Sequence, residues 1–239
     1  MITACIVQAR VASTRLPGKV LQPLAGESVL GHVLRRCRAI PGVDVVVCAT
    51  VDTPECEPIE ALAQSYGAVV HRGSETDVLD RYAKAAAAVD ADVVMRVTSD
   101  CPLIDPGLCG EVLALRASEG ADYAANNYTH GFPHGLDCDA FTAAALRRAD
   151  AEARDAYDRE HVTTWMKRQP DLRFARLDGP GGEIAQFRWT LDYAEDLAFL
   201  RALHCYLPAP PAIAPWREIL EIQRKRPELS AINALRRQR

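Results

Sequence analysis

The stretch QARVASTRLPGKVL, residues 8–21, decides the fold prediction for this chain. It follows residues 4–7, an apolar run with the composition of a buried strand. The stretch itself is polar and contains a Pro-Gly pair, so neither a strand nor an amphipathic helix continues through it. It gathers side chains that donate hydrogen bonds to anions: Arg10, Ser13, Arg15 and Lys19. We therefore interpret it as an anion-binding loop at the end of the first strand.

This loop has the properties that a polyphosphate needs. The carboxyl end of a parallel strand leaves backbone N–H groups free, and a following helix is expected to point its N-terminus at the same place. Arginine supplies planar forks and lysine a movable charge. The loop is not a Walker A motif, which needs glycine where Ser13 stands, and the chain contains no G-x-G-x-x-G. A solvated basic loop is the alternative on the local pattern.

The composition is that of one soluble α/β domain. The chain has 239 residues, of which 49% are hydrophobic and 25% charged, both ordinary values for a globular protein. The net charge of -4 argues against general binding to nucleic acid. We therefore expect the cationic loop to be a local site.

The cysteines argue for a reducing compartment. All eight are scattered along the chain, and none belongs to a C-x-x-C pair. The sequence shows no signal peptide and no apolar stretch near 18 residues. We expect a cytoplasmic protein without disulfides and without a membrane-spanning segment.

Helical and strand patterns alternate through the first half of the chain. Capping residues precede several helices, namely Ser28, Thr76 and Asp105. We expect helices at residues 29–37, 54–67, 77–89 and 105–120, and strands at 45–49, 68–71, 92–97 and 123–126. This alternation predicts an α/β fold with a mostly parallel central sheet, helices on both faces, and ligands at the carboxyl ends of the strands.

The second half of the chain follows a different pattern. Residues 126–141, NNYTHGFPHGLDCDAF, suit an excursion over the active-site face. Further helices are expected at 142–153, 159–168 and 194–207, and further strands at 172–177 and 187–191. Residues 208–215, PAPPAIAP, then form a stiff connector to a C-terminal helix and tail that end at 239.

Two aspartates follow predicted strands, and the first of them is expected at the sheet edge where the loop also emerges. Asp100 comes after the strand at 92–97, and Asp192 after the strand at 187–191. A carboxylate facing a triphosphate is a natural Mg²⁺ ligand. Both residues also suit a helix cap or a turn, and placement at a helix N-terminus explains the neighbouring Glu195 and Asp196.

Six segments in order resemble one known family: QARVASTRLPGKVL, GSETDVLDRY at 73–82, TSDCPLID at 98–105, FPHGLD at 132–137, DREHVT at 158–163 and RWTLDYAEDL at 188–197. Together they resemble the CMP-sugar synthetase (cytidylyltransferase) superfamily, and most closely the branch of spore coat polysaccharide biosynthesis protein F. The resemblance runs to about residue 207, so it implies a nucleotidyltransferase domain over 1–207, with 208–239 as connector and tail.

The resemblance implies a nucleotide-diphosphate-sugar transferase fold of the GT-A type that binds CTP and Mg²⁺. It assigns the triphosphate to Arg10, Ser13, Arg15 and Lys19, and the metal to Asp100 and Asp192. Gly73 and Asp77 fall in the segment expected near the base or ribose. Lys19, Arg15 and Asp100 are the residues that we expect to act in catalysis.

The sugar is expected to face residues 126–141, where the chain departs from the sialic acid enzymes. We assign Asn127, His134 and Asp137 to the acceptor, because amides and imidazoles suit a polyol or a carboxylate. A zinc site at His130, His134 and Cys138 is disfavoured, because Pro133 breaks the helix that such a histidine pair needs. Arg159, Glu160 and His161 could reach the site, although a solvated helix face is favoured for the first two.

The expected reaction transfers CMP from CTP to a hydroxyl of an acidic sugar or related acceptor and releases pyrophosphate, in surface polysaccharide biosynthesis. A homodimer formed through residues 128–180 is also implied by the family. One alternative is a glycosyltransferase that uses the D-x-D at Asp137 and Asp139 to bind a preformed sugar nucleotide. A nucleotide-binding subunit without turnover is another.

Overall fold

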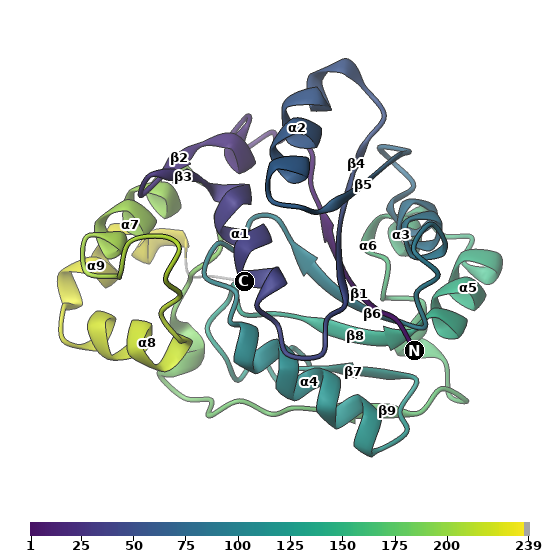
Figure 1. Cartoon of the computed structure of the whole chain (residues 1–239). Helices are drawn as coiled ribbons and strands as arrows, with labels where there is room; N and C mark the ends of the chain where they lie inside the picture. The colour runs from purple at the N-terminus through teal and green to yellow at the C-terminus, as the bar shows by residue number, and fades with distance from the viewer. Residues whose placement is uncertain (237–239) are drawn as a thin grey trace.

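A computed structural model describes residues 1–236, and within them a seven-stranded sheet forms the centre of the molecule (Figure 1). Its strand order is β5-β4-β1-β6-β8-β7-β9. Strand β8 runs antiparallel to both of its neighbours, and the other neighbouring pairs are parallel. The strands are β1 (Thr3–Gln8), β4 (Val45–Val51), β5 (Val69–Gly73), β6 (Val93–Thr98), β7 (Tyr123–Ala125), β8 (Asp139–Thr142) and β9 (Phe174–Arg176). The predicted mostly parallel α/β fold is thereby confirmed.

Helices cover both faces of the sheet because successive strand side chains point in opposite directions. In β1, Cys5 and Val7 pack with one group of helices, and Ala4 and Ile6 pack with another. The first group is α1 (Val29–Arg38), α2 (Glu57–Ser65) and α4 (Pro106–Ser118). The second includes α3 (Val78–Ala87) and α5 (Ala143–Glu152).

A third hydrophobic cluster lies beside the sheet and contains the end of the chain. Trp189 and Leu191 are buried in it together with side chains of α7 (Ala194–His204), α8 (Trp216–Arg224) and α9 (Pro227–Ile232). Figure 1 shows these three helices grouped next to the hairpin of β2 (Pro23–Leu24) and β3 (Glu27–Ser28). Residues 208–236 therefore pack against the same core as the segment that carries Asp192. None of the helices within residues 1–236 has the length and apolar character that crossing a bilayer requires.

Most predicted boundaries are confirmed within a few residues, including the caps at Ser28 and Asp105. The prediction for Thr76 is wrong, because Asp77 caps α3 by accepting the Asp80 N–H at 3.0 Å. The predicted helix over 159–168 is also wrong. Helix α6 (Ala156–His161) ends where Val162 takes a φ of 62°, and a short 3₁₀ turn, η3 (Met166–Arg168), follows.

Three further predictions require correction. Residues 187–191 do not form a strand, and Arg188 makes only an isolated parallel bridge to His134 within the described chain. The excursion over 126–141 ends in β8, so its last part lies inside the sheet instead of over the active-site face. The hairpin β2-β3 separates the first loop from α1, so the helix that follows the loop does not begin at the anion site.

Candidate active site

A cavity of about 670 Å³ opens at the carboxyl ends of β1 and β6. Its volume lies in the range of small-molecule sites. The first loop lines most of one side, from Gln8 to Val20, and the end of β6 contributes Thr98, Ser99 and Asp100. The site therefore lies where α/β sheets bind their ligands.

Cationic side chains outnumber acidic ones around this cavity in the described chain. The acidic residues are Glu75, Asp100 and Glu160. The cationic ones are Arg10, Arg15, Lys19, Arg81 and Arg96. Since the chain as a whole carries a net charge of -4, the positive charge is concentrated here, and the cavity suits an anionic ligand.

Gly18 determines the shape of the loop. Its φ of 64° lies in the left-handed region, where a side chain is strained. Its N–H donates to the Val11 carbonyl at 3.1 Å, which closes the loop, and its own carbonyl accepts the Leu21 N–H at 2.9 Å. Lys19 follows directly as the first residue of the 3₁₀ turn η1 (Lys19–Leu21). The Pro-Gly pair of the sequence thus aims Lys19 at the site.

Lys19 lies between the two predicted metal ligands. Its Nζ donates to Asp100 Oδ2 at 2.9 Å, to Asp192 Oδ1 at 2.9 Å and to the Leu191 carbonyl at 2.8 Å. Burial by itself lowers the pKa of Lys19, but the two carboxylates outweigh burial and raise it. Lys19 is therefore held protonated in this position.

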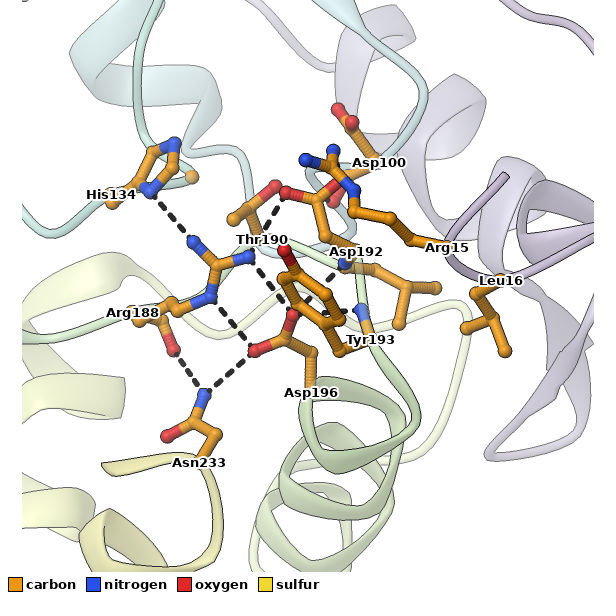
Figure 2. A network of polar contacts seen from close by, with 12 residues as sticks. Arg15, Leu16, Asp100, His134, Arg188, Thr190, Asp192, Tyr193, Asp196 and Asn233 are labelled. Carbon is orange, nitrogen blue, oxygen red and sulfur yellow. Dashed lines mark hydrogen bonds and ion pairs between the residues drawn. The ribbon is translucent and has the colours of Figure 1, made fainter. Parts of the chain in front are cut away.

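Asp192 is surrounded by cations. Its Oδ1 accepts from Arg15 at 2.5 Å as well as from Lys19. Its Oδ2 accepts from Arg188 at 3.0 Å (Figure 2). Burial raises the pKa of Asp192, but these cations outweigh it and lower the pKa to about 2. The pKa of Asp100 is likewise lowered, since Lys19 offsets the effect of burial. Both side chains are carboxylates at neutral pH.

Hydrogen bonds to the Asp100 carbonyl connect Asp100 to the segment that carries Asp192. The Leu191 N–H donates to the Asp100 carbonyl at 2.8 Å, and the Thr190 hydroxyl donates to the same oxygen at 3.2 Å. Residues 98–101 and 188–193 therefore lie side by side although they are distant in sequence.

The residues present fit a divalent cation. Two carboxylates accept hydrogen bonds from one ammonium nitrogen, which marks a position between them that already holds positive charge. Oxygen ligands are the ones that Mg²⁺ prefers. Within residues 1–236 no group of three His, Cys, Asp or Glu side chains is arranged to hold a metal. A cation here would need further oxygens from a phosphate or from water.

The structure brings some of the predicted nucleotide residues together and leaves two apart. Arg10, Ser13, Arg15 and Lys19 line the cavity. Gly73 and Asp77 are outside its lining in the described structure. Asp77 instead binds the guanidinium of Arg159 through both carboxylate oxygens, at 2.9 and 2.7 Å, in addition to capping α3.

The three predicted acceptor residues are also outside the cavity lining in the described chain, on the side of the excursion. Asn127 donates to Asp139 at 3.1 Å and accepts from Lys167 at 3.2 Å. His134 Nδ1 lies 3.2 Å from a guanidinium nitrogen of Arg188. Asp137 accepts the Gly135 N–H at 3.1 Å.

Asp139, the second carboxylate of the D-x-D, is buried in strand β8 and accepts hydrogen bonds there. Asp139 is 1% exposed and accepts from Arg96, Tyr123 and Asn127. These donors balance its charge within the sheet, where a metal would have to displace them. No contact in the described structure therefore favours a metal role for this motif.

Two of the residues 159–161 line the cavity, and the third forms ion pairs outside its lining in the described structure. Glu160 and His161 line the cavity. Arg159 is only 18% exposed, with Asp77 and Asp150 as its partners. The interpretation as a solvated helix face is therefore wrong for Arg159, which is paired with two carboxylates, whereas Glu160 is exposed to solvent and also lines the cavity.

Sequence reasoning missed four residues, namely Arg81, Arg96, Arg188 and Asn233. Arg96 interrupts an apolar strand, and such a charge is a signal that could have identified it. Arg81 and Arg188 stand in segments that carry the family resemblance, but nothing in their spacing shows that both are buried. The last residue missed, Asn233, has no signal in the sequence.

Comparisons with known sequences give a consistent result. The family model described as cytidylyltransferase matches residues 4–224. Spore coat polysaccharide biosynthesis protein SpsF of Bacillus subtilis is 35% identical over 206 residues, which cover 83% of this chain and 85% of that protein. The 3-deoxy-manno-octulosonate cytidylyltransferase of Maricaulis maris is 37% identical over 247 residues, or 91% of this chain and 90% of that protein.

Solved structures agree with the sequence matches. A cytidylyltransferase from Leptospira borgpetersenii superposes with a TM-score of 0.89 at 28% identity, and the match covers 96% of both chains. A CMP:2-keto-3-deoxy-manno-octonic acid synthetase, solved with CTP, superposes with a TM-score of 0.64 over 86% of this chain and 99% of that chain, and at 19% identity it supports the fold alone. The family model and these relatives together show that the chain belongs to the cytidylyltransferases and is a nucleotidyltransferase.

Proposed function

We propose that this cytidylyltransferase transfers CMP from CTP to a hydroxyl group of an acidic sugar or a closely related acceptor. The observation that carries the proposal is Lys19, held between Asp100 and Asp192 at the edge of a cationic cavity. A triphosphate supplies the negative charge that this cavity lacks, and the two carboxylates supply ligands for the accompanying cation.

In the proposed reaction, an acceptor hydroxyl oxygen bonds to the α-phosphorus of CTP and loses its proton to solvent. The bond between the α-phosphorus and the oxygen that bridges to the β-phosphorus breaks, and pyrophosphate leaves in line. Arg15 and Lys19 stabilise the charge that accumulates on the leaving group, while Arg10 and Ser13 hold the triphosphate. A divalent cation, for which we propose Mg²⁺ on Asp100 and Asp192, would neutralise phosphate charge.

The acceptor class rests on the relatives and on the excursion. One relative acts on 3-deoxy-manno-octulosonate, an acidic sugar, and another is named for polysaccharide biosynthesis. We extend that chemistry to this chain and assign acceptor recognition to Asn127, His134 and Asp137. Gly73, at the end of β5, and Asp77, which caps α3, remain proposed neighbours of the base or ribose.

The wider context is proposed on the same basis. Residues 1–207 form the nucleotidyltransferase domain, within which 126–180 serve the acceptor and a homodimer interface. Residues 208–239 are the proline-rich connector and the C-terminal helix and tail, of which 237–239 lie outside the described structure. The cytoplasm is the compartment that we propose, because free thiols persist there.

Pyrophosphate release tests the proposal. The protein is incubated with Mg²⁺, each of the four nucleoside triphosphates in turn, and a panel of acidic sugars. We expect release with CTP and one acceptor, and we expect Asp100→Asn to abolish it. Asp171→Asn is the matched control, because this exposed carboxylate pairs with Arg148 and neither residue lines the cavity. If the protein binds no CTP, or consumes only a preformed sugar nucleotide, the proposal is wrong.

A further inference from the structure

The two oxygens of the Asp192 carboxylate have different partners. Oδ1 accepts from Arg15 and Lys19, which line the cavity, and Oδ2 accepts from Arg188. Arg188 itself is buried, with 6% of its side chain exposed. One oxygen of Asp192 therefore contacts two side chains that line the cavity, although Asp192 itself is outside the lining in the described structure, and the other oxygen is held from behind by a buried side chain.

A second carboxylate holds Arg188 in place. Arg188 donates to Asp196 from Nε at 2.9 Å and from Nη2 at 3.0 Å, a bidentate contact of the kind that restricts a guanidinium to one orientation. Asp196 Oδ2 also accepts the N–H groups of Asp192 and Tyr193, at 2.9 and 3.0 Å. Asp196 thus fixes both the backbone that carries Asp192 and the arginine that binds its side chain.

The C-terminal segment completes this arrangement (Figure 2). Asn233 follows α9, is 1% exposed, and donates from Nδ2 to the Arg188 carbonyl at 3.1 Å and to Asp196 Oδ1 at 3.2 Å. A residue near the end of the chain thereby contacts both members of the pair behind Asp192. Of the buried Asn233 amide, Nδ2 is paired and Oδ1 has no hydrogen-bond partner in the described structure. Because a buried donor is costly to leave unpaired, the two contacts of Nδ2 stabilise this one arrangement over others.

We propose that Arg188 and Asn233 are positioning residues for Asp192, and that the C-terminal segment is thereby part of the metal-binding machinery. The inference rests on the proposed function, in which Asp192 is a metal ligand. It goes beyond that proposal by assigning a role in catalysis to a segment that the sequence presents as a tail. Partners that orient a metal ligand affect metal affinity about 10- to 100-fold.

Binding of Mn²⁺ to the full chain, measured by calorimetry, tests the proposal without relying on turnover. Asn233→Leu keeps the size of the side chain and removes both donated hydrogen bonds. Arg188→Lys keeps the charge and loses the fork, so it cannot hold both aspartates in the same way. We expect both variants to weaken Mn²⁺ binding at least tenfold. In steady-state assays the Mg²⁺ concentration for half-maximal rate rises accordingly, while the rate at saturating Mg²⁺ changes less.

Gln223→Leu is the matched control. Gln223 is a buried amide of the same C-terminal segment, and its hydrogen bonds go to the Trp189 indole and to Ser230. We expect this variant to lose stability but to keep the Mn²⁺ affinity of the unaltered protein. Arg188→Lys carries the test if Asn233→Leu does not fold.

Three results would overturn the proposal. Equal Mn²⁺ affinity in the unaltered protein and in the folded Asn233→Leu or Arg188→Lys variant would show that Asp192 needs no positioning. An equal loss in Gln223→Leu would mean that general loosening of the C-terminal segment is responsible. If the unaltered protein binds no Mn²⁺ at all, the metal site of the proposed function is itself refuted, and the positioning role falls with it.

Discussion

Replacing Lys19 by methionine tests whether its ammonium occupies the position of a cation. Each 2.9 Å contact to Asp100 or Asp192 corresponds to an attraction of about 6 kcal/mol at an effective dielectric constant of 20. Desolvation of the three charges and repulsion between the carboxylates offset most of this. Removing one partner from a buried pair costs about 3–5 kcal/mol. Because the Asp100 side chain is 26% exposed, we expect Lys19→Met to lower the free energy of unfolding by about 2 kcal/mol.

Thermal unfolding with and without Mn²⁺ is the assay. A loss of about 2 kcal/mol lowers the Tm of a chain of this size by roughly 4–8 °C. The variant leaves two carboxylates facing each other, so Mn²⁺ should raise its Tm more than that of the unaltered protein, in which the ammonium competes for the same oxygens. Turnover should fall about a hundredfold through the loss of about 3 kcal/mol of transition-state stabilisation.

Lys84→Met is the control, because Lys84 also lies 2.9 Å from a carboxylate, that of Asp80, but is 64% exposed. We expect no measurable change in its Tm, since exposed pairs contribute little. The reasoning is refuted if Lys19→Met has an unchanged Tm, or if Mn²⁺ stabilises the variant and the unaltered protein equally.

Three other predictions concern stability, measured by urea unfolding. Burial lowers the pKa of His204 to about 4 despite a hydrogen bond to the Leu200 carbonyl, so the unfolded chain binds the proton first as pH falls below 6.5. Between pH 7 and pH 5 the free energy of unfolding should therefore fall by about 2 kcal/mol more in the unaltered protein than in His204→Phe. Equal losses would show that His204 does not cause this pH dependence. Asp105→Ala removes the cap of α4 and the acceptor for the Trp216 N–H, at 2.7 and 2.8 Å, and should cost about 2 kcal/mol. Asp155→Ala, at a position without a side-chain cap bond in the described chain, should cost less. Gly135→Ala should cost more than 2 kcal/mol, because φ is 111° and the new Cβ would lie 2.7 Å from the Thr190 nitrogen. Gly181→Ala, at a φ of 69° with no atom of the described structure within 4 Å of the new Cβ, should lose only about 1 kcal/mol.

The sequence predicted those parts of the fold that depend on local patterns of residue types. The continuous apolar run at residues 45–49 and the largely apolar run at 92–97, which Arg96 interrupts, mark parallel strands, because such strands are buried on both faces. Capping chemistry at Ser28 and Asp105 locates helix starts for the same local reason. Prediction failed at residues 187–191, whose apolar side chains are buried in a cluster of helices and loops instead of in the sheet. Burial and strand pairing produce the same apolar pattern there.

The sequence by itself determined the cationic loop, the aspartates at 100 and 192, and the α/β class, since each depends on residue types and their order along the chain. Only the tertiary structure decided which groups meet. Two contacts join residues that are far apart in sequence: the Leu191 N–H with the Asp100 carbonyl, and Asn233 with both Arg188 and Asp196. Arg188 and Asp192 are only four residues apart, but their spacing does not show that they form a buried contact. Such contacts follow from the packing of the whole chain, which no local pattern encodes.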